Sequence, residues 1–414
     1  SMDASLRAAA LCASWQVCLV LLCASGGAEA FTSPRVEIFA GSRVEAFAGA
    51  HVARFARPPS ARRSSTLAAA PMVPFGSAPP GEMMSSSDVA DGPKHVPEGA
   101  LYPIFEEKLK EVGAIMLLPE ARDDGPLSMR LGYMAPETNF AFSDVIRASS
   151  SKGRLAVVAD MKQCTLDPGG LQLDMKPAGT DLLRDAKDML SVGVDALLVS
   201  CDSARFGCSL SEMELLAEVL RGPTGVGTAT ARNPPLLAKN FVVHPIQIAQ
   251  MVEAGASAVL LICALVGPDL ELLLNTCTIM GVEAVVEVHT PDELLFAIEA
   301  GATAVIANRR SRATGRVNAA LAIQLGAIIP GHVLSLATGN YCLPDEGGRI
   351  GSQEIEAVLE AGYDGIIVGR AFASAAGPAV RSELAAKVVA EVKRHELLQR
   401  AASWGRNPFT TVDV

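Results

Sequence analysis

The chain has 414 residues, of which 50% are hydrophobic and 19% are charged, so it can bury a large core and is neither a disordered nor a collagen-like polymer. It carries 35 Lys and Arg against 45 Asp and Glu, a formal net charge of -10, which argues against general nucleic-acid binding. Its 9 cysteines include no C-x-x-C pair and its 6 histidines show no metal-binding spacing, so we expect no disulfide framework and no metal site.

Residues 1–30 have the features of a signal peptide. An apolar run over residues 8–24 follows Arg7 and leads to Ala28-Glu29-Ala30, the small-x-small pattern of a signal-peptidase site. The alternative is a membrane-spanning helix, for which a run of about 17 residues is short. The cleavage pattern favours a segment that is removed.

Residues 31–70 are rich in Arg, Ser and Ala, contain no Lys and have few acidic residues, which is typical of an organelle transit peptide. A signal peptide followed by such a segment, with Phe31 directly after the cleavage site, resembles the bipartite leaders of plastid proteins in algae with secondary plastids. The resemblance implies a plastid (chloroplast) location. Residues 71–99 are rich in Pro and Ser and are predicted to be a linker, so we expect residues 1 to about 99 to be absent from the mature protein or disordered.

After residue 150, short apolar and β-branched runs alternate with helical patterns, which indicates parallel βα units. Near-continuous apolar strands are expected in a sheet that is buried on both faces. A count of eight favours a closed (β/α)8 TIM barrel over a doubly wound open sheet, which is the alternative. The predicted strands are Leu155–Lys162, Asp195–Asp202, Pro235–Val243, Ala258–Leu265, Glu283–His289, Ala304–Arg309, His332–Thr338 and Gly365–Arg370.

Helical signals surround these strands. The segments Pro245–Gly255, Pro291–Gly301 and Ser352–Gly362 begin with Pro or Ser and stop at Ala-Gly, as helix ends prefer. Ahead of the barrel, Ile104–Val112 and Phe140–Ala148 predict an N-terminal helical extension that covers the bottom of the barrel or flanks its entrance. The predicted boundaries are 100–150 for the extension, 151–402 for the barrel with a closing helix over 377–402, and 403–414 for a C-terminal tail.

Polar residues end four of the predicted strands: Lys162 the first, Lys239 the third, Glu287 the fifth and Asn308 the sixth. In such a barrel the C-terminal strand ends converge on one mouth, where the chemistry takes place. Lysines between apolar walls and beside each other's charge can have lowered pKa values, which suits a general acid, and a Glu there can hold or accept a proton. The set predicts acid/base chemistry, and no Ser-His-Asp or Cys-His arrangement competes with it.

The last two predicted strands end in Ala337-Thr338-Gly339 and Gly369-Arg370. Glycines at these ends let backbone N–H groups approach a phosphate, and Arg310 lies two residues beyond Asn308 to add charge. Together these residues predict a phosphate-binding site.

The middle strands resemble those of the indole-3-glycerol-phosphate synthase family. Leu236–Ile248, with Lys239-Asn240-Phe241 at the strand end, is similar to the family's Lys-Asp-Phe strand and the helix after it. Val259–Leu265 and Val285–His289 resemble its fourth and fifth strands, and Asn308-Arg309-Arg310 falls at its Asn-x-Arg. The similarity covers about residues 140–375 and is strongest over strands three to six.

The resemblance implies a role for each matching residue. Lys239 corresponds to the family's general acid, Glu287 to its paired acid/base carboxylate and Lys162 to the lysine on the substrate carboxylate. Asp160 stands where the family has Glu, and Asn308 joins this catalytic set. The implied substrate and phosphate contacts are Thr165, Phe206, Ser209, Arg310, Thr338, Gly339 and Gly369, with Arg370 adjoining them.

Several departures from the family pattern bear on activity. Asn240 replaces the Asp after the acid lysine, and Ala337 occupies the position where the family carries a Glu before Ser-Gly. An extra Gly/Pro-rich loop, residues 340–349, follows strand seven, and the end of strand one, residues 162–166, lacks the family's Ser-Pro. We expect binding of a phosphorylated ligand to survive these changes better than full catalytic power.

The resemblance implies a carboxy-lyase of tryptophan biosynthesis, of reduced activity, that closes, decarboxylates and dehydrates 1-(2-carboxyphenylamino)-1-deoxyribulose 5-phosphate without a cofactor. The implied partner is this small phosphorylated substrate, with no nucleic acid, no membrane after leader removal, and room for association with other tryptophan-pathway enzymes. One alternative is a catalytically weakened or inactive phosphate-binding barrel with a regulatory or structural role, which Ala337 and Asn240 favour. Another is a sugar-phosphate isomerase, which the retained acid/base residues argue against.

Overall fold

The computed structural model describes residues 95–404 with gaps at 123, 134, 136, 165–180, 222–233, 313, 346–348, 374 and 376, and it describes side chains up to residue 396. The predicted signal peptide, transit segment, linker up to residue 94 and tail from residue 405 lie outside the described residues, as does Thr165. Within the described ranges, no helix is both long and apolar enough to cross a membrane.

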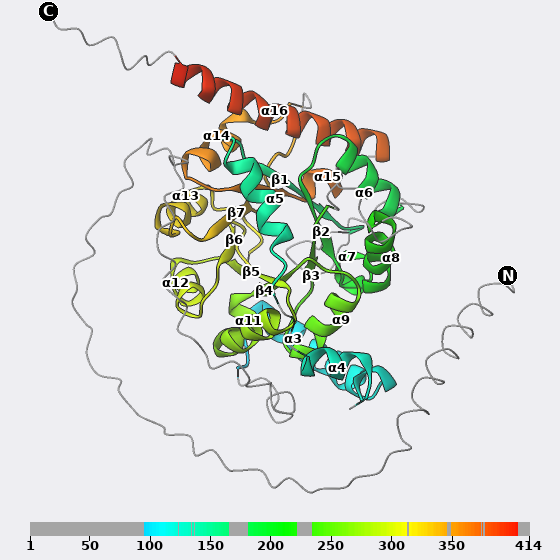
Figure 1. The fold of residues 1–414 in the computed structure, drawn as a ribbon. Coiled ribbons are helices and arrows are strands. Elements are labelled where there is room, and N and C mark those ends of the chain that lie inside the picture. Colours follow the sequence, from blue (N-terminus) through cyan, green and yellow to red (C-terminus); the bar gives the residue numbers. More distant parts are fainter. Residues whose placement is uncertain are drawn as a thin grey trace, which may run out of the picture. The chain divides into compact units, whose positions relative to one another are not determined.

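Eight parallel strands close into a barrel in which each strand pairs with its neighbours in the sequence and β8 pairs with β1 (Figure 1). The predicted (β/α)8 barrel is therefore confirmed, and the doubly wound alternative is wrong. The strands are shorter than predicted: seven of them end before the predicted residue, where the chain turns into the following loop, and β7 begins later than predicted. They are β1 Ala156–Met161, β2 Ala196–Ser200, β3 Leu236–Lys239, β4 Ala258–Ile262, β5 Glu283–Val288, β6 Ala304–Asn308, β7 Leu334–Thr338 and β8 Gly365–Val368.

Helices surround the strands and bury their outer face. The predicted Pro starts are confirmed, and α12 begins after Thr290, whose hydroxyl accepts a hydrogen bond from the backbone N of Glu293. The longer helices of the barrel are α6 Leu182–Ser191, α8 Leu210–Arg221, α9 Pro245–Glu253, α11 Leu270–Ile279, α12 Pro291–Glu299, α13 Ala319–Ile328, α14 Ser352–Glu360 and α16 Pro378–Trp404. Short helical turns are α7 Ser203–Phe206, α10 Cys263–Val266, α15 Arg370–Ala373, η1 Gly99–Leu101, η2 Pro119–Ala121 and η3 Gly267–Asp269.

The N-terminal extension supplies three helices: α3 Tyr102–Met116, α4 Pro126–Gly132 and α5 Ala141–Ser150. In Figure 1, α5 lies across the ring of strands. It covers the N-terminal end of the barrel, because Glu283 at the start of β5 accepts hydrogen bonds from the backbone N of Phe142 at 2.8 Å and of Ser143 at 3.2 Å. Arg147 donates to the His332 carbonyl at 3.1 Å, just before β7. This part of the extension therefore covers the bottom, as one predicted arrangement required.

Candidate active site

Two charged side chains meet at the end of β1. Lys162 Nζ lies 2.6 Å from Asp160 Oδ2, and the Ser200 hydroxyl at the end of β2 donates to Asp160 Oδ1 at 2.9 Å. Gly369, just after β8, leaves room for the pair, because a Cβ there would lie 2.5 Å from Asp160 Oδ2 and 3.0 Å from Lys162 Nζ. Burial alone raises the pKa of Asp160, but Lys162 and Lys239 outweigh it and lower that pKa below its ordinary value. An ionised carboxylate therefore lies beside an ammonium.

A second pair joins β3 and β5. Lys239 Nζ lies 3.7 Å from Glu287 Oε2, and the Asn308 amide at the end of β6 donates to Glu287 Oε1 at 3.1 Å. Burial alone lowers the pKa of Lys239, but Glu287 and Asp160 outweigh it and raise that pKa above its ordinary value. The expectation of a lowered lysine pKa is therefore wrong for Lys239, because the fold brings two carboxylates to it. A protonated Lys239 can donate a proton, as a general acid must.

Sequence reasoning misses a further member of this cluster, His289. Its Nε2 lies 2.7 Å from Glu287 Oε1, and its Nδ1 lies 2.8 Å from the carbonyl oxygen of Arg310. Burial alone raises the pKa of Glu287, but Lys239 and His289 outweigh it and lower that pKa well below its ordinary range. The spacing in the sequence could have identified His289, because it lies two residues after Glu287 and residues two apart on a strand point to the same face.

The predicted phosphate residues approach each other at the ends of β6 and β7. Gly339 has a φ of 116°, and a Cβ there would lie 2.7 Å from Arg309 Cγ and 3.1 Å from the backbone N of Arg310. Arg310 Nε donates to the Gly315 carbonyl at 3.0 Å, and its backbone N donates to Asn308 Oδ1 at 3.0 Å. Gly339 and Arg310 therefore lie together.

The other predicted phosphate residues lie at the end of β8. Gly369 is beside Lys162, as its close approach to the lysine nitrogen shows, and Arg370 begins α15. The predicted residues that the structure describes thus follow or end strands of the same barrel. Asp160, Lys162, Gly369 and Arg370 lie at β1 and β8, Phe206 and Ser209 lie after β2, and Lys239, Glu287, Asn308, Arg310, Thr338 and Gly339 lie at β3 to β7.

Known proteins match this chain over its barrel. The family model described as "Indole-3-glycerol phosphate synthase" matches residues 103–384. The chain belongs to the indole-3-glycerol phosphate synthase family. A curated relative of that name from Opitutus terrae is 29% identical over 240 residues, covering 58% of this chain and 82% of the relative. Another from Mycolicibacterium gilvum is 32% identical over 248 residues, covering 60% of this chain and 81% of the relative.

Membership in the synthase family makes the register at the end of β7 informative. Glu287 pairs with Ile306, and Asn308 of the same strand pairs with Thr338. Paired residues share a face, and Asn308 contacts Glu287 in the interior, so Thr338 also faces the interior. Ala337 then faces the helices and is fully buried. That Ala337 stands where the family carries a Glu stays a prediction, and in this chain the residue that presents a polar group to the interior at this strand end is Thr338, with its hydroxyl.

Arg309, the middle residue of the synthase family's Asn-x-Arg, holds the loop that follows β7. Its Nε donates to the Gly339 carbonyl at 2.8 Å, and its Nη2 donates to Glu354 of α14 at 2.7 Å. The guanidinium also lies 3.6 Å from the ring centre of Tyr341. The start of the extra loop is thus built around a buried arginine, which fixes the conformation of Gly339.

An aromatic pair lines the Lys239 side of the synthase site. The rings of Phe206 and Phe241 are stacked with centroids 6.0 Å apart and an interplanar angle of 11°. Lys239 Nζ lies 5.7 Å from the centre of the Phe206 ring, and the Arg205 guanidinium lies 5.5 Å from that of Phe241. The predicted contact residue Phe206 is therefore beside the acid lysine. Ser209 instead donates its hydroxyl to Glu212, at 2.9 Å.

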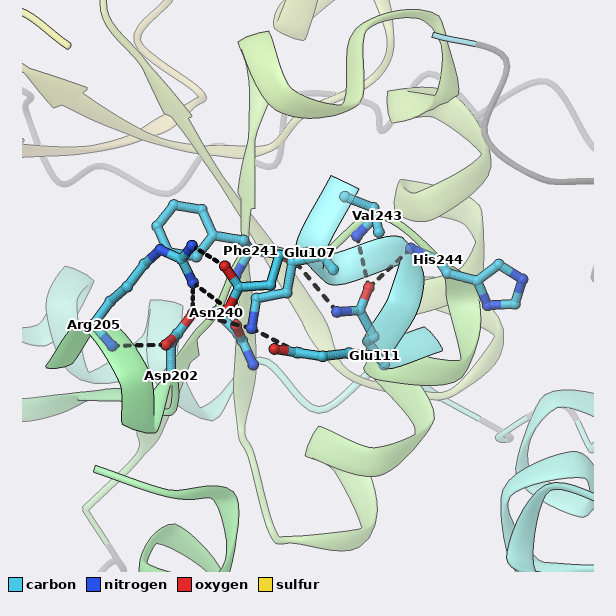
Figure 2. A network of polar contacts seen from close by, with 10 residues as sticks. Glu107, Glu111, Asp202, Arg205, Asn240, Phe241, Val243 and His244 are labelled. Carbon is cyan, nitrogen blue, oxygen red and sulfur yellow. Dashed lines mark hydrogen bonds and ion pairs between the residues drawn. The ribbon is translucent and has the colours of Figure 1, made fainter. Parts of the chain in front are cut away.

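Helix α3 reaches this aromatic pair through buried charges (Figure 2). Lys108 Nζ lies 3.0 Å from Asp202 Oδ2, and these two side chains are only 2% and 1% exposed. Arg205 joins them, with Nη1 3.1 Å from Asp202 Oδ2 and Nη2 2.5 Å from Glu107 Oε2. We call Glu107, Lys108, Asp202 and Arg205 the α3 clasp. Because Asp202 follows β2, this part of the extension flanks the entrance of the barrel, so both predicted arrangements occur.

Asn240 has a local structural role that an amide fulfils. Its Oδ1 accepts a hydrogen bond from the backbone N of Phe241 at 2.7 Å. The Gln247 side chain fixes the same loop, accepting from the backbone N of Val243 at 2.7 Å and donating to the Phe241 carbonyl at 3.2 Å. The departure at Asn240 therefore preserves the position of the aromatic pair.

Proposed function

We propose that this chain catalyses the family reaction: ring closure, decarboxylation and dehydration of 1-(2-carboxyphenylamino)-1-deoxyribulose 5-phosphate to the indole product. The observation that carries the proposal is the buried Lys239–Glu287 pair, with Nζ 3.7 Å from Oε2, facing the Asp160–Lys162 pair across one end of the barrel. Membership in a family of carboxy-lyases of tryptophan biosynthesis supports the same conclusion.

Each charged side chain has a distinct role in this proposal. Lys239, held protonated by its two carboxylate neighbours, gives a proton to the substrate carbonyl oxygen as the aromatic carbon attacks the carbonyl carbon. Lys162 holds the substrate carboxylate until it leaves as carbon dioxide, and Asp160 holds Lys162. Glu287 transfers protons while the new hydroxyl leaves as water.

The phosphate of the substrate binds, in this proposal, at the backbones of Gly339 and Gly369 with Arg310. Strand-end backbone N–H groups and a guanidinium supply hydrogen-bond donors and positive charge in one place. The close packing of Gly339 against the Arg310 backbone supports this arrangement. In the sequence, Arg370 directly follows Gly369, and Thr165 comes three residues after Lys162.

A second candidate is a barrel that binds the substrate but turns it over poorly. Ala337 and Asn240 favour it, because an alanine and an amide cannot supply the charge of the carboxylates that the family carries at these positions. Such a protein would serve a regulatory or structural role.

Turnover of the substrate, followed by the fluorescence of the indole product, tests the proposal. Lys239→Ala and Glu287→Gln should each lower turnover by about 10² or more, the usual scale for loss of an acid/base group. Lys110→Ala, an exposed lysine of α3, is the control and should leave turnover unchanged. Substrate binding without turnover in the parent chain would favour the second candidate, and an unchanged rate in Lys239→Ala would reject the assigned roles.

We further propose that residues 1–70 direct the chain to a plastid and that residues 1 to about 99 are absent from the mature protein or disordered. The apolar run, the Ala-Glu-Ala pattern and the Arg-rich segment after it support this. Mass spectrometry of the native protein tests removal, and a mature chain that begins near residue 2 would contradict it. Co-purification of the native protein tests its association with other tryptophan-pathway enzymes.

A further inference from the structure

Both ring nitrogens of His289 face oxygen atoms that accept hydrogen bonds. Nδ1 lies 2.8 Å from the Arg310 carbonyl oxygen, which has no hydrogen to donate, so Nδ1 must carry a proton. Nε2 lies 2.7 Å from Glu287 Oε1. A neutral imidazole carries only one N–H, so a neutral His289 would direct the lone pair of Nε2 at the carboxylate. One proton must therefore lie between Nε2 and Oε1.

The surroundings of Glu287 locate that proton on the histidine. Oε1 already accepts from the Asn308 amide at 3.1 Å, and Oε2 lies 3.7 Å from the Lys239 ammonium. Both contacts favour an ionised carboxylate. With Glu287 ionised, Nε2 carries the proton and His289 is an imidazolium.

The other charged groups near His289 compensate each other. From α12, Glu293 accepts from the backbone N of His289 at 2.9 Å, but its carboxylate is bound by both terminal nitrogens of Arg312, at 2.6 and 2.9 Å. From β6, Arg310 presents its carbonyl to the ring. Glu287 is thus the counterion of the imidazolium. The His289 side chain is only 9% exposed, so bulk water has little access to its ring.

We propose that His289 stores the proton that Glu287 delivers during the loss of water, an inference that rests on the proposed function. The N–H bond at Nε2 breaks and an O–H bond forms at Oε1, so imidazolium and carboxylate become neutral imidazole and carboxylic acid with no change in total charge. The Nδ1–H bond to the Arg310 carbonyl holds the ring in place throughout. A carboxylate that is ionised at rest thereby acts as an acid. His289 acts through Glu287 and is a positioning residue.

Nitrogen NMR of the full chain with 15N-labelled histidine tests the stored proton without any need for activity. His289→Gln assigns the His289 signals, and exposed His332 at the opposite end of the barrel serves as an internal reference. At pH 7.5 both nitrogens of His289 should show the protonated signature that its two acceptor contacts require, read against the signals of His332. Glu287→Gln should remove the second proton from His289. A single-proton His289 in the parent chain would overturn the proposal.

The pH dependence of turnover supplies a readout that a purely structural role would not change. His289→Gln and His289→Asn should lower kcat by about tenfold or more, within the range of acid/base contributions, and leave KM within about twofold. The pH profile of kcat should also differ between the parent and both variants. His332→Gln is the matched control with parental rates.

Equal kcat in the parent and in both His289 variants, each with a parental thermal melting profile, would overturn the proposal. If the parent chain turns over no substrate, the proposed function fails, and the NMR result still decides whether Glu287 and His289 share the proton.

Discussion

At the end of β7, two adjacent residues face opposite sides of the barrel wall, so substitutions there should have opposite effects. Thr338→Glu places a carboxylate in the interior beside Asn308. We expect turnover to rise tenfold or more, because one transition-state interaction is worth about 10² to 10³ in rate. The measurement is kcat with the carboxyphenylamino substrate.

Ala337→Glu is the matched comparison. Ala337 faces the helices with 0% exposure, so a carboxylate there is buried without a partner, which should destabilise the fold by about 3 kcal/mol or more. Denaturation by urea measures this. An Ala337→Glu variant that folds normally and turns over faster than the Thr338→Glu variant would contradict the register argument.

The residues of the site could be predicted from the sequence only in part. Lys162, Lys239, Glu287 and Asn308 stand out because each interrupts an apolar run at the end of a strand. Their electrostatics could not be predicted, since the raised pKa of Lys239 depends on carboxylates from other strands. The faces of Ala337 and Thr338 could not be predicted either, since they depend on how β7 pairs with β6.

Among the elements, the α3 clasp ties a helix outside the barrel to the loop that follows β2. Lys108→Met should lower the free energy of unfolding by about 3 kcal/mol, because it leaves the Asp202 carboxylate buried without its nearest ammonium. Lys110→Met changes an exposed lysine of the same helix and should cost less than about 0.5 kcal/mol. Urea denaturation of both variants checks this. Equal stabilities would mean that Arg205 alone satisfies Asp202.

The hydrogen bonds of Arg309 to Gly339 and to Glu354 of α14 are a second contact between elements whose loss should be measurable. Arg309→Lys cannot reproduce the planar set of hydrogen bonds to Gly339 and Glu354, so the loop after β7 should loosen. We expect KM for the phosphorylated substrate to rise by about tenfold, equal to about 1.4 kcal/mol, with kcat changed less. Arg349→Lys, 84% exposed in the same loop, should keep the parental KM. A rise in KM for Arg349→Lys but not for Arg309→Lys would contradict this role of Arg309.

The order of the elements could be predicted because each strand is a short apolar run and three of the outer helices have a Pro or Ser start. The contacts of the extension could not. Lys108 has the sequence context of an ordinary exposed helix lysine, and its partner Asp202 lies 94 positions later, so only the folded structure brings them together.

At the scale of the molecule, buried carboxylates should set the acid limit of stability. Asp160, Asp202 and Glu287 all have lowered pKa values, because nearby cations outweigh the effect of burial. Their stabilisation is present above the unfolded pKa values of about 4 and is lost as the pH falls through the folded values. Burial raises the pKa of Glu283, so this group works in the opposite direction.

With three buried carboxylates of lowered pKa against one of raised pKa, we expect the free energy of unfolding to fall as the pH drops below about 4. Urea denaturation across that range measures the loss. Lys108→Met, in which the Asp202 carboxylate loses a cation, should lose less on acidification than the parent does. A parent chain that is equally stable at pH 7 and pH 3 would contradict this account.

The α3 clasp also limits how far a protease can shorten the chain from its N-terminal side. Helix α3 begins at Tyr102, and the lysine that neutralises Asp202 lies in its second turn. Cuts ahead of α3 leave the clasp intact, whereas a cut just after Lys108 removes the lysine and exposes the loop that carries Phe206. A tolerated cut and a destabilising cut are thus separated by only a few peptide bonds.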